Sequence, residues 1–120
     1  MSKKTVILGA TTNPERYAYL AAERLTQHGH EIVPIGIKKG TVFGKEILSG
    51  QPAIENVDTV TLYLNPMNQR DYYQYILNLH PKRVIFNPGT ENDELEDLLE
   101  KYNIEIVEGC TLVMLGSGQF

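Results

Sequence analysis

The sequence predicts an α/β domain built on a doubly wound, mostly parallel sheet of about five to six strands. Short apolar runs rich in Val and Ile alternate along the chain with segments of helical periodicity, which is typical of a parallel sheet covered by helices. Several runs are almost continuously apolar, as expected of strands buried on both faces. With 120 residues, of which 42% are hydrophobic, the chain suits one compact core. We therefore expect residues 1–120 to form a single, three-layer, Rossmann-like domain.

The apolar runs predict five strands, in order Thr5–Gly9, Glu31–Gly36, Thr59–Leu64, Arg83–Asn87 and Ile104–Glu108. A final apolar run, Leu112–Leu115, predicts one more strand. Between the second and third strands, residues 38–56 carry glycines at 40, 44 and 50. Glycine at this density favours turns over regular elements, so this stretch predicts an irregular crossover with one short strand or helical turn.

Three helices are predicted from apolar residues at helical spacing. The first has Asn13 as its N-cap and Pro14 in its first position, and it ends at Gly29. The second covers about Asn68–Leu79 and the third about Asn92–Tyr102. The apolar positions that define the three helical faces are Tyr17, Leu20, Ala21 and Leu25, then Tyr72, Tyr75, Ile76 and Leu79, then Leu95, Leu98, Leu99 and Tyr102.

The charge distribution and the cysteine count exclude several classes of protein. The net charge is −4, divided as +4 over residues 1–45, −1 over 46–90 and −7 over 91–120, which argues against a nucleic-acid partner. No apolar run approaches the roughly 18 residues of a membrane span, and no secretory signal is recognisable. A single cysteine and three scattered histidines predict neither an internal disulfide nor a metal site. We expect a cytoplasmic location.

The residues that follow the strands are the candidates for ligand binding. In doubly wound sheets, ligands bind outside the carboxyl ends of the strands, where the strand order reverses. After the first strand, Gly9 and Ala10 lead through small polar residues to a helix start, a pattern that brings backbone N–H groups and a positive helix end toward an anion. Thr11 and Thr12 add hydroxyl groups, and Arg16 adds a charge nearby. A plain tight turn is the alternative interpretation.

The loop after the second strand narrows the choice of ligand. Thr11 and Pro14 occupy the second and third glycine positions of the dinucleotide fingerprint, so that fingerprint is incomplete. An NAD site usually has an acidic residue at the end of the second strand, whereas this chain has Gly36-Ile37-Lys38-Lys39. The lysines favour a ligand with a phosphorylated ribose, either coenzyme A or NADP, unless they only form a solvated loop.

Four segments together resemble a known family: Gly9–Arg16, Val33–Gly36, Asn87–Thr90 and Val107–Cys110. In order along almost the whole chain, they are similar to the small CoA-binding domain family and to the N-terminal domain of the succinyl-CoA synthetase alpha subunit. The resemblance implies a Rossmann-like fold with a site for coenzyme A or acyl-CoA.

The same resemblance implies roles for individual segments. Residues 11–13 would contact the phosphates, Lys38 the adenosine-phosphate end, Tyr63–Pro66 the adenine, and Asn87–Gly89 the rest of the ligand. The full set of predicted cofactor-binding residues is Gly9, Ala10, Thr11, Thr12, Asn13, Arg16, Gly36, Lys38, Tyr63, Asn65, Pro66, Asn87, Pro88 and Gly89.

No set of nucleophile, base and orienting group can be assembled at this edge. The three histidines are predicted at the opposite, amino-end edge, and the synthetase domain that carries a phosphorylated histidine has no counterpart here. The sequence therefore favours a binding module, such as a carrier, sensor or regulatory protein, over an enzyme. The alternatives are an NADP-linked oxidoreductase, a half-enzyme completed by a partner subunit, and a fold that acts through protein contacts.

Two further features carry open alternatives. Cys110 follows the fifth strand, where it either forms a mixed disulfide with the thiol of the coenzyme or serves as a small buried residue. The second predicted helix contains more tyrosines than one buried face requires, namely Tyr72, Tyr73 and Tyr75. One of them is therefore a candidate for a homodimer contact.

Overall fold

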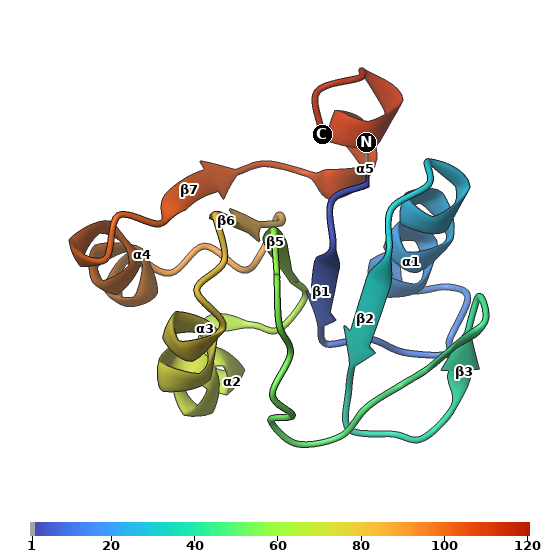
Figure 1. The fold of residues 1–120 in the computed structure, drawn as a ribbon, viewed down its shortest axis with the longest axis horizontal. Coiled ribbons are helices and arrows are strands. Elements are labelled where there is room, and N and C mark those ends of the chain that lie inside the picture. Colours follow the sequence, from blue (N-terminus) through green and yellow to red (C-terminus); the bar gives the residue numbers. More distant parts are fainter. Residues whose placement is uncertain (1) are drawn as a thin grey trace.

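A five-stranded parallel sheet with helices on both faces forms the centre of the computed structural model, which describes residues 2–120 (Figure 1). The strands are β1 (Thr5–Leu8), β2 (Ile32–Ile35), β5 (Thr59–Leu62), β6 (Arg83–Phe86) and β7 (Glu105–Glu108), in the order β2-β1-β5-β6-β7. The order reverses at β1, because the chain first moves outward to β2 and then returns to the other side of β1. The predicted fold class is confirmed, and each of the first five predicted strands has bounds within two residues of the observed strand.

Every residue of β1, β2, β5 and β6 is buried, which explains why these strands are nearly continuous apolar runs. Successive side chains point to opposite faces of the sheet. In β1, Val6 and Leu8 belong to one apolar cluster, whereas Ile7 belongs to the other. The sheet thus separates two cores, one on each face.

Helices α1 (Tyr17–Gln27) and α5 (Thr111–Gly116) pack against each other on the face of Ile7. The opposite face is covered by α3 (Tyr73–Leu79) and α4 (Asp93–Lys101). The short helix α2 (Pro66–Gln69) and the 3₁₀ turn η1 (Arg70–Tyr72) lead into α3. The predicted second helix is therefore divided into three pieces, and it begins at Pro66 because Asn65 caps it.

The predicted start of the first helix is wrong. Helix α1 begins at Tyr17, with Arg16 as its N-cap, and the side chain of Tyr17 is 70% exposed instead of facing the core. The Asn13 side chain accepts a hydrogen bond from the N–H of Glu15 at 3.0 Å. Asn13 thus closes a turn ahead of the helix instead of capping it. Asparagine side chains often bond to the backbone two residues farther along, and this turn competes with the helix cap.

The predicted strand at Leu112–Leu115 is also wrong, because these residues lie in α5. Short apolar runs do not distinguish strands from helices by periodicity alone. Leu115 is buried against the α1 face, so its burial comes from helix packing and not from an extension of the sheet. The irregular crossover contains a small antiparallel hairpin, β3 (Thr41–Val42) and β4 (Lys45–Glu46), which turns through Gly44 at φ +84°.

At the amino ends of the strands, the aromatic ring of Phe120 covers two basic side chains. The guanidinium carbon of Arg83 lies 4.4 Å from the ring centroid, and the ring of His30 lies 4.9 Å from it. Lys3 donates its side-chain N–H to the Phe120 carbonyl and its backbone N–H to His30 Nδ1, the latter at 2.9 Å. Burial and the nearby Lys3 charge lower the pKa of His30. This cluster joins both ends of the described chain.

No helix within residues 2–120 combines the length and the apolar character needed to cross a bilayer.

Replacing Phe120 with alanine should lower the free energy of unfolding by about 2 kcal/mol, since the ring contributes both apolar burial and a cation–π contact. Urea denaturation would measure the loss. Tyr102→Ala is the matched control, because Tyr102 is 63% exposed and should change stability by less than about 0.5 kcal/mol. Equal losses in the two variants would contradict this role of Phe120.

Candidate functional site

At the carboxyl ends of β1, β2 and β5, the backbones of the three following loops lie in direct contact. The N–H groups of Gly9 and Ala10 both donate to the carbonyl oxygen of Ile35, each at 2.9 Å. A methyl group on Gly36 would overlap the carbonyl oxygen of Ala10, and a Cβ on Gly9 would lie 3.1 Å from the backbone of Tyr63. Gly9 also has φ +101°, a conformation that favours glycine. These contacts fix the three loops relative to one another.

Free backbone donors lie farther along the first loop than Gly9 and Ala10. Within residues 2–120, the N–H groups of Thr11, Thr12, Tyr17 and Ala18 have no hydrogen-bond acceptor. Tyr17 and Ala18 form the first turn of α1, which has no side-chain cap. Uncapped N–H groups at a helix start carry partial positive charge and bind anions readily. The Thr11–Thr12 segment and the start of α1 are therefore the candidate anion site of this edge.

Basic side chains lie beside these donors. Arg16 is exposed at the N-cap of α1, and Lys38 is exposed in the loop after β2. That loop is held against the first loop at both ends, because Gly36 contacts Ala10 and Gly40 contacts the Thr12 side chain. The next residue, Lys39, lines an open groove of about 550 Å³ together with Gly40, Thr41, Glu46, Ile47, Leu48, Ser49 and Pro52. The cations of the first two loops therefore share one corner of the sheet.

Asn87, the first residue after β6, uses its side chain to connect elements of the protein. Its amide nitrogen donates to Thr61 Oγ1 at 2.7 Å and to the Leu62 carbonyl at 2.8 Å, and its amide oxygen accepts from the N–H of Thr111 at 2.9 Å. Only 3% of Asn87 is exposed. Both side-chain N–H groups are thus committed to protein partners, and a ligand at this loop would contact its neighbours or its backbone.

Gln69 supports the same edge, although its position in a predicted helix gave no sign of this. It is completely buried at the end of α2. Its amide nitrogen donates to the carbonyls of Leu64 and Thr90, both at 2.8 Å, and its amide oxygen accepts from Asn92 Nδ2 at 2.8 Å. Asn92 also donates to the Tyr73 hydroxyl at 2.8 Å and caps α4. This network fixes the loops after β5 and β6 to each other.

The remaining predicted residues of the β5 and β6 loops lie at the surface of the edge. Asn65 accepts from the N–H of Asn68 at 2.9 Å and caps α2, and Pro66 occupies the first turn. Pro88 is exposed, and Gly89, at φ +91°, donates its N–H to a carboxylate oxygen of Glu91 at 2.9 Å. These four residues are exposed at the edge.

Tyr63 and Cys110 lie close together beneath these loops. Burial, the largest cause, together with the nearby Cys110 raises the pKa of Tyr63 to about 12, although hydrogen bonds with the Thr111 and Thr61 hydroxyl groups oppose this rise. The phenol is therefore neutral at physiological pH and is not a proton acceptor. Cys110 is half-buried at the N-cap of α5.

Most of the chain, residues 3–116, matches the family model described as "CoA binding domain". The chain belongs to this CoA-binding domain family. The predicted resemblance is thereby confirmed, together with coenzyme A as the class of ligand that defines the family. No curated protein matches the sequence.

Solved structures show that this CoA-binding domain has close structural relatives. One, described only as the crystal structure of an uncharacterized protein, is 65% identical with a TM-score of 0.98, and the alignment covers 100% of this chain and 99% of the other. The structure of cell-free ID.343 from Thermus thermophilus is 25% identical, with a TM-score of 0.88 and coverage of 99% and 91%. A hypothetical protein from Pyrococcus horikoshii OT3 shares the fold at 24% identity, with a TM-score of 0.88 and coverage of 97% and 83%.

His28, His30 and His80 lie at the amino ends of β2 and β6, at the opposite edge of the sheet from the candidate site of this CoA-binding domain. His28 contacts the Arg24 carbonyl, and His80 ends α3 in a left-handed conformation. Each histidine thus has a local structural role far from the carboxyl edge.

Gly36→Ala should lower the free energy of unfolding by about 2 kcal/mol, because the new methyl group meets backbone that cannot rotate away. Gly116→Ala is the matched control, since a Cβ there lies in open space within a helix and should be neutral or slightly stabilising. Urea denaturation of both variants tests this, and unchanged stability of Gly36→Ala would show that the strand ends are less tightly packed than described.

Gln69→Leu should lower the free energy of unfolding by about 3 kcal/mol, because it preserves side-chain volume but leaves two buried carbonyls and one amide without partners. Hydrogen exchange should also accelerate in the loops after β5 and β6. The control is Gln74→Leu, which removes only an exposed contact with Asn78 and should have a small effect. Unchanged hydrogen exchange in both loops would show that Gln69 does not hold them in place.

Proposed function

We propose that the carboxyl edge binds coenzyme A through backbone N–H groups and two flexible cations. The observation that carries the proposal is the uncapped start of α1, with free N–H groups beside the exposed Arg16. The pyrophosphate would accept from Thr11, Thr12 and the first turn of α1, with Arg16 balancing its charge. Asn13 would border this site through its exposed side chain.

The phosphorylated ribose would be recognised by Lys38. Three features support this role: Lys38 is exposed, its loop is packed against the first loop, and the strand before it ends without an acidic residue. Lysine offers three donors to a phosphate on a flexible chain. The hydrogen bonds and glycine contacts at Gly9, Ala10 and Gly36 would act indirectly, by allowing the backbone to come close to the ligand.

The adenine and the pantetheine arm would contact the loops after β5 and β6. Tyr63, Asn65 and Pro66 would border the adenine, and the Pro88–Gly89 segment would line the arm. Because the Asn87 amide is committed within the protein, we expect it to shape this loop and not to bind the ligand through its side-chain nitrogen.

The biochemical role that fits this site is binding without catalysis, in a stand-alone carrier, sensor or regulatory protein for coenzyme A or acyl-CoA. The buried Tyr63 phenol holds its proton, and the histidines lie on the other side of the sheet. An NADP-linked oxidoreductase, or a half-enzyme completed by a partner subunit, is the alternative, since NADP also carries a ribose phosphate that would suit Lys38. A homodimer is a further arrangement in which the same site could operate.

Thermal-shift and calorimetric titrations with coenzyme A, dephospho-coenzyme A, NADP and NAD test the proposal. Coenzyme A should bind best, and at 100 times its dissociation constant it should stabilise the fold by about 2.7 kcal/mol. Lys38→Ala should reduce the preference for coenzyme A over dephospho-coenzyme A by about fivefold, the loss of an exposed ion pair of about 1 kcal/mol.

Lys101→Ala, in α4, is the matched control and should leave that preference unchanged. Equal affinity of the unmodified protein for coenzyme A and dephospho-coenzyme A would remove the role of Lys38. A dominant response to NADP would favour the oxidoreductase alternative.

A further inference from the structure

The turn of the β3–β4 hairpin places an aromatic residue where the backbone favours small ones. Val42 pairs with Lys45, so Phe43 and Gly44 form a two-residue turn, in which their φ angles are +47° and +84°. Positive φ at both central positions is typical of the type I′ turn, which prefers asparagine followed by glycine. A bulky side chain rarely adopts such a φ, so a contact elsewhere must stabilise Phe43 in this conformation.

That contact is the packing of the Phe43 ring against Tyr19 of α1. The two ring centroids lie 5.0 Å apart and the ring planes are tilted by 58°, which lies within the range of favourable aromatic pairs. Both rings adjoin the apolar cluster on the α1 face of the sheet, in which Val42 and Ile47 are buried. The aromatic pair therefore fastens the tip of the hairpin to α1, while the two aliphatic residues hold its base.

The hairpin in turn holds the cation loop, the exposed Ile-Lys-Lys segment at residues 37–39. At the start of this loop, the N–H of Gly36 donates to the Leu48 carbonyl at 2.9 Å. At its end, the Gly40 carbonyl accepts from the N–H of Ile47 at 2.8 Å. Both hydrogen-bond partners directly follow β4 in the chain. Any displacement of the hairpin would therefore be passed on to the cation loop at both of its ends.

The same hairpin joins the cation loop to the two parts of the candidate anion site. Gly40 lies so close to Thr12 that an added Cβ would overlap the threonine methyl group. Tyr19 is the third residue of α1, whose first turn carries the free N–H groups. The Phe43–Tyr19 contact thus sets how far the cation loop lies from the start of α1.

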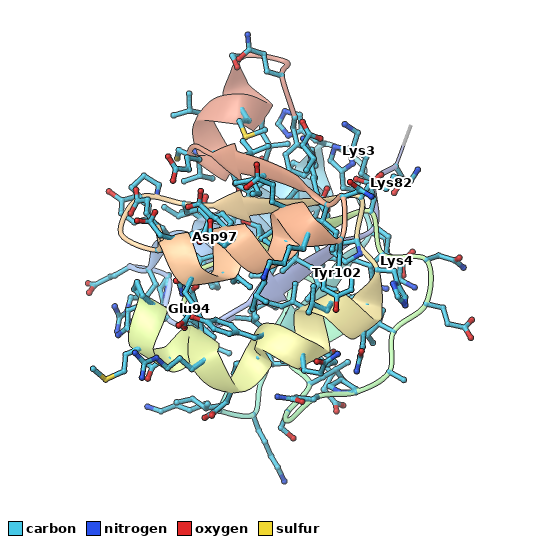
Figure 2. All side chains as sticks on the ribbon, turned by 90° about the vertical axis from the view of Figure 1, so that its left-hand side faces the viewer. Lys3, Lys4, Lys82, Glu94, Asp97 and Tyr102 are labelled. Carbon is cyan, nitrogen blue, oxygen red and sulfur yellow. The ribbon has the colours of Figure 1, made fainter. Side chains whose placement is uncertain are left out.

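Other lysines lie too far away to replace those of the cation loop. Lys3 and Lys4 precede β1 and Lys82 precedes β6, so all three are at the amino edge of the sheet. Figure 2 shows them gathered on one side of the molecule. A phosphate at the carboxyl edge must find its lysine elsewhere, and the cation loop supplies two, Lys38 and Lys39.

We propose that Phe43 is a positioning residue, whose contact with Tyr19 places Lys38 at a fixed separation from the start of α1 and so determines selectivity for a phosphorylated ribose. The inference rests on the proposed function, in which the start of α1 binds the pyrophosphate and Lys38 the ribose phosphate. These phosphates are joined through one ribose, so their binding groups must keep a defined separation. A lysine on an unfastened loop would lose more conformational entropy on reaching its phosphate.

Calorimetric titrations with coenzyme A and dephospho-coenzyme A test the proposal in Phe43→Asn, which suits the turn but removes the ring. The preference for coenzyme A should fall by about threefold, a large part of the loss expected for Lys38→Ala. The affinity for dephospho-coenzyme A should change little, because the first loop is unaltered. Tyr19→Ala removes the other ring and should have the same effect, and the double variant should lose no more preference than either single variant.

Two control variants separate positioning from general stability. Phe43→Tyr keeps the aromatic ring and should retain the preference. Phe120→Ala removes a ring at the amino edge and should also retain it, although the fold is less stable. In the absence of ligand, amide exchange at Ile47, whose N–H bonds to Gly40, should accelerate in Phe43→Asn and in Tyr19→Ala.

The outcomes distinguish this inference from the proposed function on which it rests. If the unmodified protein shows no preference for coenzyme A over dephospho-coenzyme A, the proposed function fails and the inference fails with it. A preference that persists in either Phe43→Asn or Tyr19→Ala would overturn the inference alone, whatever the effect on amide exchange. An equal loss of preference in Phe120→Ala would assign the effect to stability and would likewise overturn the positioning role.

Discussion

The carbonyl oxygen of Ile35 accepts two backbone hydrogen bonds, from Gly9 and Ala10, and the geometry of the carboxyl edge depends on this contact. It draws the first loop across the end of β2, where the absence of a side chain at Gly36 leaves room for the Ala10 carbonyl. The chain after Ala10 must then turn outward before α1 can begin. This is why the free N–H groups lie farther along the chain, at Thr11, Thr12 and the helix start.

Two buried amides, Asn87 and Gln69, hold the other loops of this edge. Each bridges elements that are distant in sequence, and each has its side-chain nitrogen fully used within the protein. A buried polar group without partners destabilises a fold strongly, so such bridges allow few alternative arrangements. The edge thus combines a closely bonded backbone with two exposed basic side chains, Arg16 and Lys38.

The positions of the five strands of the sheet could be predicted from the sequence, because strands buried on both faces form short, nearly continuous apolar runs. The edge on which the candidate residues lie followed from the parallel topology alone. The outcome of competition among turns, helix caps and tertiary packing was harder to predict. Asn13 closes a turn where a helix cap was expected, and Leu112–Leu115 becomes a helix because α1 offers Leu115 an apolar neighbour, which no local pattern reveals. Gln69 looks like a surface residue in the sequence, since its significance lies in partners contributed by other elements.

The cluster around Phe120 has a practical consequence. Lys3, His30 and Phe120 bring both ends of the described chain to the amino side of the sheet, where Figure 1 places the N and C labels close together. The four-residue strands separate that side from the carboxyl edge by about 13 Å. An affinity handle, a fluorophore or a sensor-chip linkage attached beside Lys3 or Phe120 would therefore lie at the amino edge of the sheet, away from the candidate ligand-binding edge.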